Sequence, residues 1–239
     1  MPDGDGAAAQ TVRPTAAQPI RDAATLILYR RRSGGGLEVL MGERHGASAF
    51  MPNRFVFPGG RLDPADYRMR PAQPLSPISL ARLGRSRKTG PRKATALALA
   101  AIRETFEESG LRLAAPAHGA ITPPSPAWTD FCAGSHAPDP GALLYICRAI
   151  TPPGRPRRFD ARFFAAPAEA ASGTVRPSAE LDKLDWIAPE DTGGLLLPGI
   201  TQYVLAHLAA WLEPGALDDP ARQVPFHFMR HGRRQLAWE

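Results

Sequence analysis

The chain has 239 residues with 44% hydrophobic side chains and a formal charge of +6, which suits one domain with extensions and favours an anionic ligand such as a phosphorylated nucleotide. Two cysteines exclude a disulfide framework, and there is no run of 18 apolar residues to span a membrane. The first residues lack the basic and apolar stretches of a secretion signal, so we expect a cytoplasmic protein without a membrane partner.

The first half of the chain is expected to form three strands and a helix. Residues 1–19 are rich in Ala, Pro and Gln and are expected to be disordered. Apolar runs predict strands over 22–31, 37–44 and 55–57, the first two joined by a glycine-rich turn. After a long insert, a helix is expected over 94–109. Its predicted core-facing residues are Thr95, Leu99, Ile102 and Phe106.

The second half is expected to continue the mixture of strands and helices. Strands are predicted over 142–150, 159–165 and 183–187, and an amphipathic helix over 200–212. A shorter helix is expected to begin at Pro189, because acidic residues follow in its first turn. Strands and helices mixed in this order indicate an α+β protein.

The domain limits follow from composition. We expect the globular domain to span 20–215, with a basic insert over 67–93. The tail over 216–239 is mixed basic and aromatic, and is expected to be either an edge strand or the arm of a homodimer. A nucleic-acid partner is disfavoured, because no recognised pattern of interleaved basic and aromatic residues is present.

Three carboxylates lie on one stripe of the predicted 94–109 helix. Glu104, Glu107 and Glu108 are spaced i, i+3 and i+4, so their side chains share one face and repel each other. A solvated acidic surface is the ordinary interpretation of such spacing. The alternative is a divalent cation, since Mg²⁺ prefers carboxylate oxygens and accepts substrate phosphate as a further ligand.

A glycine turn upstream favours the metal interpretation. The strand at 55–57 is followed by Pro58, Gly59 and Gly60. Two glycines let the main chain approach another group closely, so a backbone carbonyl can act as an oxygen ligand.

The glycine turn and the acidic helix together resemble the signature of the Nudix hydrolases. Gly60 takes the first position of that signature, Asp66 stands where the family has Glu, and the run 103–111 matches closely, with Thr105 in an apolar slot. The resemblance implies an α/β/α sandwich with a mixed central sheet. It also implies that Arg103 orients a helix glutamate, and that Mg²⁺ or Mn²⁺ is bound by a ligand set of Gly59 (through its carbonyl), Glu104, Glu107 and Glu108.

Two departures from the signature point to one branch of the family. Asp66 is one methylene shorter than Glu, and 36 residues separate it from Arg103 where the family has seven. The split resembles that of the peroxisomal-type coenzyme A diphosphatases, which share the pattern found here over 59–66. The stretch 40–44 resembles their coenzyme A motif loosely, and makes Arg44 a candidate substrate contact.

Further candidate residues lie outside the signature. Glu180 is the best late candidate for the general base, and the alternative is that it only caps or solvates its loop. Arg157 and Arg158 precede a predicted strand and are expected to bind the 3′-phosphate of coenzyme A. The eight basic residues of the insert could make a similar contact, or could form a solvated, partly mobile loop.

The leading hypothesis is a metal-dependent diphosphatase that cleaves coenzyme A or acyl-coenzyme A to 3′,5′-ADP and a 4′-phosphopantetheine product. A rival of the same class is a hydrolase of ADP-ribose, a dinucleotide or a nucleoside triphosphate, because the signature is shared and only its surroundings discriminate. A rival of a different class is a non-catalytic Nudix-fold binding or regulatory module. The intact set of three glutamates disfavours it, because a binder does not need three mutually repelling acids.

Overall fold

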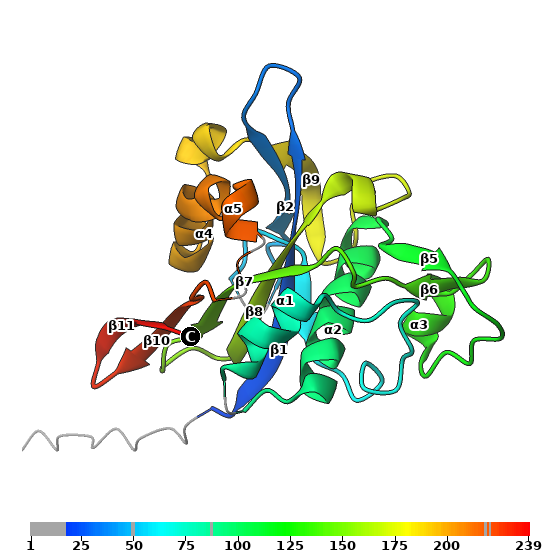
Figure 1. Ribbon diagram of the computed structural model, residues 1–239. Helices are drawn as coiled ribbons and strands as arrows, with labels where there is room; N and C mark the ends of the chain where they lie inside the picture. Colours follow the sequence, from blue (N-terminus) through cyan, green and yellow to red (C-terminus); the bar gives the residue numbers. More distant parts are fainter. Residues whose placement is uncertain (1–17, 49–50, 87, 218, 220) are drawn as a thin grey trace, which may run out of the picture.

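The computed structural model describes residues 18–48, 51–86, 88–217, 219 and 221–239. Within these ranges a nine-stranded mixed sheet forms the centre of the molecule (Figure 1). Most of the tail predicted to be disordered, residues 1–17, lies outside the described residues. The main path of the sheet has the order β11 (Arg233–Trp238), β10 (Pro225–Arg230), β7 (Leu144–Ile150), β8 (Arg158–Pro167), β1 (Ile20–Arg31), β2 (Leu37–Arg44) and β3 (Phe55–Val56).

Two more strands and the helices complete the fold. The strand β4 (Gly59–Arg61) pairs with β1, β9 (Leu181–Ile187) pairs with β2, and β5 (Ala114–Pro116) pairs with β6 (His136–Pro138) in a small separate sheet. The helices are α1 (Pro77–Gly84), α2 (Pro91–Ser109), α3 (Pro126–Phe131), α4 (Gly199–Trp211) and α5 (Pro214–Leu217). Short 3-10 helices cover Ala168–Ala170 and Pro189–Gly194, so the helix expected to begin at Pro189 is a 3-10 helix.

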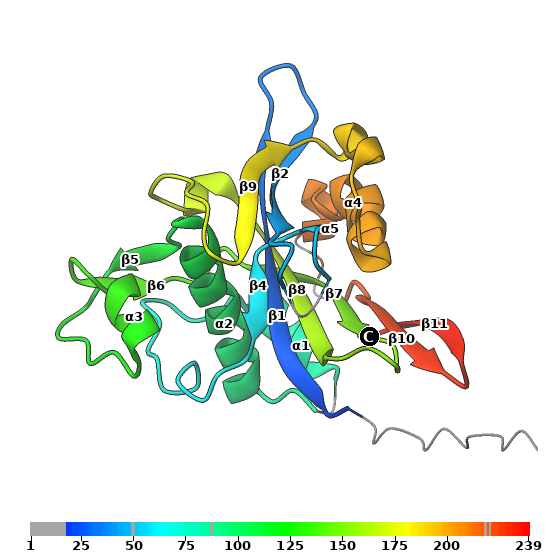
Figure 2. The ribbon, with the colours of Figure 1, turned by 180° about the vertical axis from the view of Figure 1, so that it is seen from behind.

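Alternation along β1 explains why helices cover both faces of the sheet. Successive side chains of a strand point to opposite faces. Leu26 and Leu28 accordingly join the core beneath α2, whereas Ile27 joins the core beneath α4. Figure 2 shows α2 and α4 on opposite sides of β1. The expected α/β/α sandwich with a mixed central sheet is confirmed.

The helix α2 is buried on more than the one face predicted. It begins at Pro91, three residues before the predicted start, and ends at Gly110, which has a left-handed φ of 76°. Leu97 and Ala98 are buried together with the predicted Leu99, because α1 and α3 pack against α2 on sides away from the sheet. The apolar pattern of the α2 sequence predicts one buried face, but it does not show that helices from other segments pack against the remaining faces.

The insert is a structural element of the core. Its side chains Met69, Leu75 and Leu83 belong to the core beneath α2. The buried Arg82 donates through Nη2 to the carbonyl oxygens of the C-terminal segment, at Ala216, Leu217 and Asp219. Arg85 likewise donates to main-chain oxygens of Arg222 and Glu239. These hydrogen bonds of Arg82 and Arg85 are all made to the protein's own backbone. The polyanion contact, one of the two possibilities named for the basic residues of the insert, is not what they form.

The C-terminal tail belongs to the domain. The strand β10 pairs in parallel with β7, and β11 forms the outer edge. Arg148 forms a two-pronged ion pair with Asp160 and a further ion pair with Glu239, so the last residue of the chain is held against the sheet. The predicted boundary at 215 is wrong, because these long-range contacts are invisible in the composition of the tail. The tail does supply an edge strand, one of its two expected forms.

We expect Arg82→Ala to lower the free energy of unfolding by about 2–3 kcal/mol without changing kcat, because hydrogen bonds from a charged donor are lost far from the acidic helix stripe. Urea unfolding and steady-state kinetics measure the two effects. The matched control is Arg70→Ala, since Arg70 is an exposed arginine of the same insert. Equal stability of both variants would show that Arg82 does not hold the C-terminal segment.

Candidate active site

The pair Gly59 and Gly60, predicted to form a turn, instead lies in the strand β4, which pairs with β1 and packs directly against the acidic helix α2. The Gly59 N–H donates to Oε2 of Glu108 at 2.8 Å. A Cβ atom at Gly60 would lie 2.4 Å from the carboxyl carbon of Glu104, so only glycine leaves room for that carboxylate. At Gly59 a Cβ atom would lie 2.6 Å from the backbone oxygen of Ala24 in β1. The two glycines thus position the carboxylates of Glu108 and Glu104.

The two glycines are expected to differ when each is replaced by alanine. Gly60→Ala pushes only the flexible end of Glu104, so activity is expected to fall strongly while the melting temperature changes little. Gly59→Ala meets the β1 backbone and is expected to lower the melting temperature as well. Thermal unfolding and kcat/KM of both variants test this contrast, and a fully active Gly60→Ala variant would contradict the assigned position of Glu104.

Asp66 positions Arg103. Its two carboxylate oxygens accept from Nε and Nη2 of Arg103 at 2.9 and 3.0 Å, and the Asp66 side chain is fully buried. The indole Nε1–H of Trp128 donates to the same carboxylate at 3.1 Å. Asp66 therefore reaches the helix arginine, although its side chain is one methylene shorter than that of glutamate.

Trp128 is the residue of this site that sequence reasoning missed. It lies in α3, which begins at Pro126 after the N-cap Ser125. A serine followed by proline is a recognisable helix start. That signal predicts the short helix, but not that Trp128 reaches Asp66 across 62 residues of chain.

Arg103 connects Asp66 to the acidic stripe. Its Nη1 group donates to Glu104 and to Glu107, at 2.9 Å each. Its Nη2 group also donates to the main-chain oxygen of Arg61 at 3.1 Å. The geometry agrees with the orienting role that the family resemblance implies. Thr105, in the signature's apolar slot, is fully buried and donates its hydroxyl to the Ala101 carbonyl at 2.8 Å.

The three glutamates all have raised pKa values. Burial raises the pKa of Glu104 to about 7, against the lowering effect of Arg103 and with a further rise from Glu107. Burial is also the main cause of the raised pKa of Glu107, and it raises the pKa of Glu108 well above the usual range. Arg103, and Arg44 at Glu108, lower these pKa values by less than burial raises them, so the cluster favours a further cation or protons.

The donor set fits a divalent cation in the type of its ligand atoms. Each glutamate uses one oxygen in a hydrogen bond, Glu104 and Glu107 with Arg103, and Glu108 with Gly59. The second oxygen of each remains a candidate ligand, and hard cations prefer such oxygens. Within the described residues, no three acidic, histidine or cysteine side chains already stand close enough together to hold an ion. The Gly59 carbonyl as a ligand stays a prediction.

Arg44 and Glu180 lie at the same site. Residue 44 pairs with Leu181 across β2 and β9, and Nη2 of Arg44 lies 3.4 Å from Oε2 of Glu180. Glu180 contributes to the raised pKa values of Glu104, Glu107 and Glu108, so it is within electrostatic reach of all three. Its side chain is 66% exposed, which leaves it accessible to water. Its role as general base stays a prediction.

The structure does not bring Arg157 and Arg158 to the acidic cluster. Residue 158 pairs with Ile20, five residues along β1 from Thr25, which stands opposite Gly59. Five residues of strand span about 16 Å. Arg158 also donates through Nε to the carbonyl of Thr151 at 3.0 Å, and so stabilises its own hairpin. A contact with a diphosphate at the acidic cluster is therefore not supported, whereas the expected contact of these arginines with a 3′-phosphate stays a prediction.

Comparisons with known proteins agree with this geometry. No family model matches the chain. A solved Nudix hydrolase from Alicyclobacillus acidocaldarius is 31% identical, with a TM-score of 0.61 over 81% of this chain and 92% of that protein. The acyl-coenzyme A diphosphatases NUDT19 of Xenopus laevis and Gallus gallus are 33% and 36% identical over 40% of this chain, covering 35% and 33% of the relatives. The chain thus spans about a third of the length of these curated relatives. It belongs to the Nudix hydrolase family.

Proposed function

We propose that this Nudix hydrolase cleaves the diphosphate linkage of coenzyme A or acyl-coenzyme A, with Mg²⁺ or Mn²⁺, to 3′,5′-ADP and the corresponding 4′-phosphopantetheine. The buried chain from Asp66 through Arg103 to Glu104 and Glu107 carries the proposal, because it places repelling carboxylates beside the glycine pair. The substrate rests on the signature split between Asp66 and Arg103, and on two relatives named as acyl-coenzyme A diphosphatases.

Each residue of the site has a proposed role in a hydrolysis in which water cleaves the P–O–P bridge. The bound ion would neutralise phosphoryl oxygens and lower the pKa of a bound water. Glu104, Glu107 and Glu108 would hold the ion, while Arg103 keeps two of them oriented. Glu180 is the proposed base that accepts the proton of the attacking water. The water oxygen and its remaining proton stay on the attacked phosphate, and the proton accepted by Glu180 passes through solvent to the departing phosphate, so the two products together contain one added water molecule.

A substrate panel tests the proposed reaction. Coenzyme A, an acyl-coenzyme A, ADP-ribose, a dinucleotide and a nucleoside triphosphate are incubated with Mg²⁺ or Mn²⁺, and the products are identified by mass. We expect coenzyme A derivatives to have the highest kcat/KM and to yield 3′,5′-ADP. Faster cleavage of ADP-ribose would replace the substrate assignment, and no turnover of any compound would contradict the proposed catalysis.

Metal is expected to stabilise the protein more at high pH than at low pH. The raised pKa of Glu104, about 7, means that its ionisation costs folding free energy as the pH rises through that value. Below about pH 4.5 the group is protonated in both folded and unfolded chains and this cost disappears. In EDTA the melting temperature should therefore fall between about pH 5.5 and about pH 8.5, and Mg²⁺ should reverse the fall. Glu104→Gln should weaken the pH dependence of the melting temperature. An increase in melting temperature with Mg²⁺ that is equal at both pH values would contradict the prediction.

A cytoplasmic location and a homodimer remain proposals. They are supported by two buried free thiols, Cys132 and Cys147, and by the outer edge that β11 presents. In the described part of the chain, no helix has the length and apolar character needed to cross a membrane. Light scattering coupled to size-exclusion chromatography would measure the oligomeric state.

A further inference from the structure

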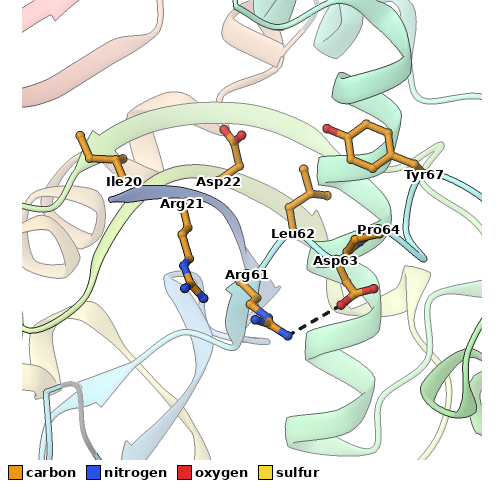
Figure 3. A pocket seen from close by; sticks show the side chains of 8 residues that line it. All are labelled: Ile20, Arg21, Asp22, Arg61, Leu62, Asp63, Pro64 and Tyr67. Carbon is orange, nitrogen blue, oxygen red and sulfur yellow. Dashed lines mark ion pairs between the residues drawn. The ribbon is translucent and has the colours of Figure 1, made fainter. Parts of the chain in front are cut away.

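An open pocket adjoins the candidate active site at the start of β1. It has a volume of about 660 Å³ and is lined by β1 residues around Arg21 and by the chain that follows β4 (Figure 3). A smaller pocket of about 240 Å³ contains Glu104 and Glu107. Arg61 and Asp63 line both pockets, so the two spaces are adjacent.

The larger pocket presents two arginines on one face of the sheet. Arg61 stands opposite Ala23 in the antiparallel pair of β4 and β1, so Arg21 and Arg61 are diagonal neighbours on the same face. Figure 3 shows their side chains extending in the same direction. Two long cationic side chains at diagonal positions are within reach of one anionic group.

The acidic residues of the pocket do not cancel this charge. Asp22 points away from the two arginines (Figure 3) and is paired with Lys93 at 2.7 Å and with Arg162 at 3.0 Å. Asp63 lies 3.9 Å from Arg61 in an exposed pair, which is a weak interaction. Arg21 has no ion pair within the described residues and is exposed. The pocket is therefore a positively charged recess that adjoins the smaller pocket with Glu104 and Glu107.

We infer that this pocket binds the monoester phosphate on the ribose of the substrate nucleotide, through Arg21 and Arg61, while the diphosphate lies at the acidic helix. The inference rests on the proposed coenzyme A diphosphatase function. In coenzyme A only the ribose separates the 3′-phosphate from the diphosphate, which matches two adjacent pockets that share Arg61. A dianionic phosphate forms charge-assisted bonds with arginine forks. Arg21 and Arg61 thereby take the role first expected of Arg157 and Arg158.

The kinetic test compares coenzyme A with dephospho-coenzyme A. The parent enzyme should show a kcat/KM about tenfold or more higher for coenzyme A, a ratio that one charge-assisted bond can supply. The double variant Arg21→Met with Arg61→Met should bring that ratio close to one. The ratio is the readout, because Arg61 also lines the catalytic pocket and its loss can change both rates. The matched control, Arg157→Ala with Arg158→Ala, should keep the parent ratio.

A binding test without catalysis separates this inference from the proposed function. Calorimetry in EDTA compares 3′,5′-ADP, 2′,5′-ADP and 5′-AMP, with circular dichroism to verify folding of each variant. We expect 3′,5′-ADP to bind tightest to the parent, by about tenfold over 5′-AMP, and the double variant to lose this preference. If the double variant loses the preference for 3′,5′-ADP but the parent does not hydrolyse coenzyme A, the proposed function is overturned and the pocket assignment is retained.

Three results would overturn the pocket assignment. The first is a parent that binds 3′,5′-ADP and 5′-AMP equally. The second is a 3′-phosphate preference that survives in the Arg21→Met, Arg61→Met variant while coenzyme A is hydrolysed, which would leave the proposed function intact. The third is tighter binding of 2′,5′-ADP than of 3′,5′-ADP, which would assign the recess to a 2′-phosphate.

Discussion

Glu107→Gln is expected to lower kcat by about a hundredfold or more, equivalent to about 2.7 kcal/mol of activation free energy. The glutamine keeps the size of the side chain and removes the charge that a divalent ion needs. The Glu107 side chain is 37% exposed, so the substitution should leave the fold and the melting temperature almost unchanged. Steady-state kinetics with saturating Mg²⁺, together with thermal unfolding, measure both quantities.

The control for this prediction is Glu213→Gln, an exposed glutamate just after α4. It should retain the parent kcat, because removing one surface charge outside the site changes no ligand. Excess EDTA should abolish turnover in the parent and in the control. Full turnover of the parent in EDTA would contradict metal-dependent hydrolysis, and a fully active Glu107→Gln variant would remove this carboxylate from the reaction.

Asp66→Ala is expected to lower the free energy of unfolding by about 3 kcal/mol, because the buried guanidinium of Arg103 loses its two-pronged partner and keeps only the contacts of Nη1 with Glu104 and Glu107. The Arg103 side chain is only 8% exposed, so water cannot replace the lost ion pair. The kcat should fall as well, since Arg103 no longer holds Glu104 and Glu107 in place. Urea unfolding gives the stability change, and product formation gives the kinetic one.

Two further variants separate the ion pair from the packing around it. Trp128→Phe removes only the indole hydrogen bond to Asp66, so a smaller loss of about 0.5–1.5 kcal/mol is expected. Asp66→Glu restores the residue of the family signature and should keep more stability and activity than Asp66→Ala. If Asp66→Ala were as stable as the parent, the buried ion pair would not hold the site together.

The acidic stripe and the need for glycine at 59–60 were readable from the sequence, because both depend on short-range geometry, whereas the turn predicted there is the strand β4. The spacing of Glu104, Glu107 and Glu108 places them on one face of any helix they occupy. The glycine pair at 59–60 likewise marks a place where the main chain must approach another group. The apolar run over 22–31 predicted the strand β1, and the order of strands and helices predicted the fold class, since the pattern of apolar residues is a local property.

Contacts between distant segments were decided only by the tertiary structure. Trp128 meets Asp66, the partner of Arg103, because α3 packs on α2, and no local pattern encodes that packing. The same holds for Arg82, whose place in a basic insert suggested an exposed cation, although the fold buries it against the C-terminal segment. Register along β1 likewise separates Arg158 from the acidic helix and brings Arg21 beside Arg61. Chain composition records which charges are present, whereas strand pairing and helix packing determine which of them meet.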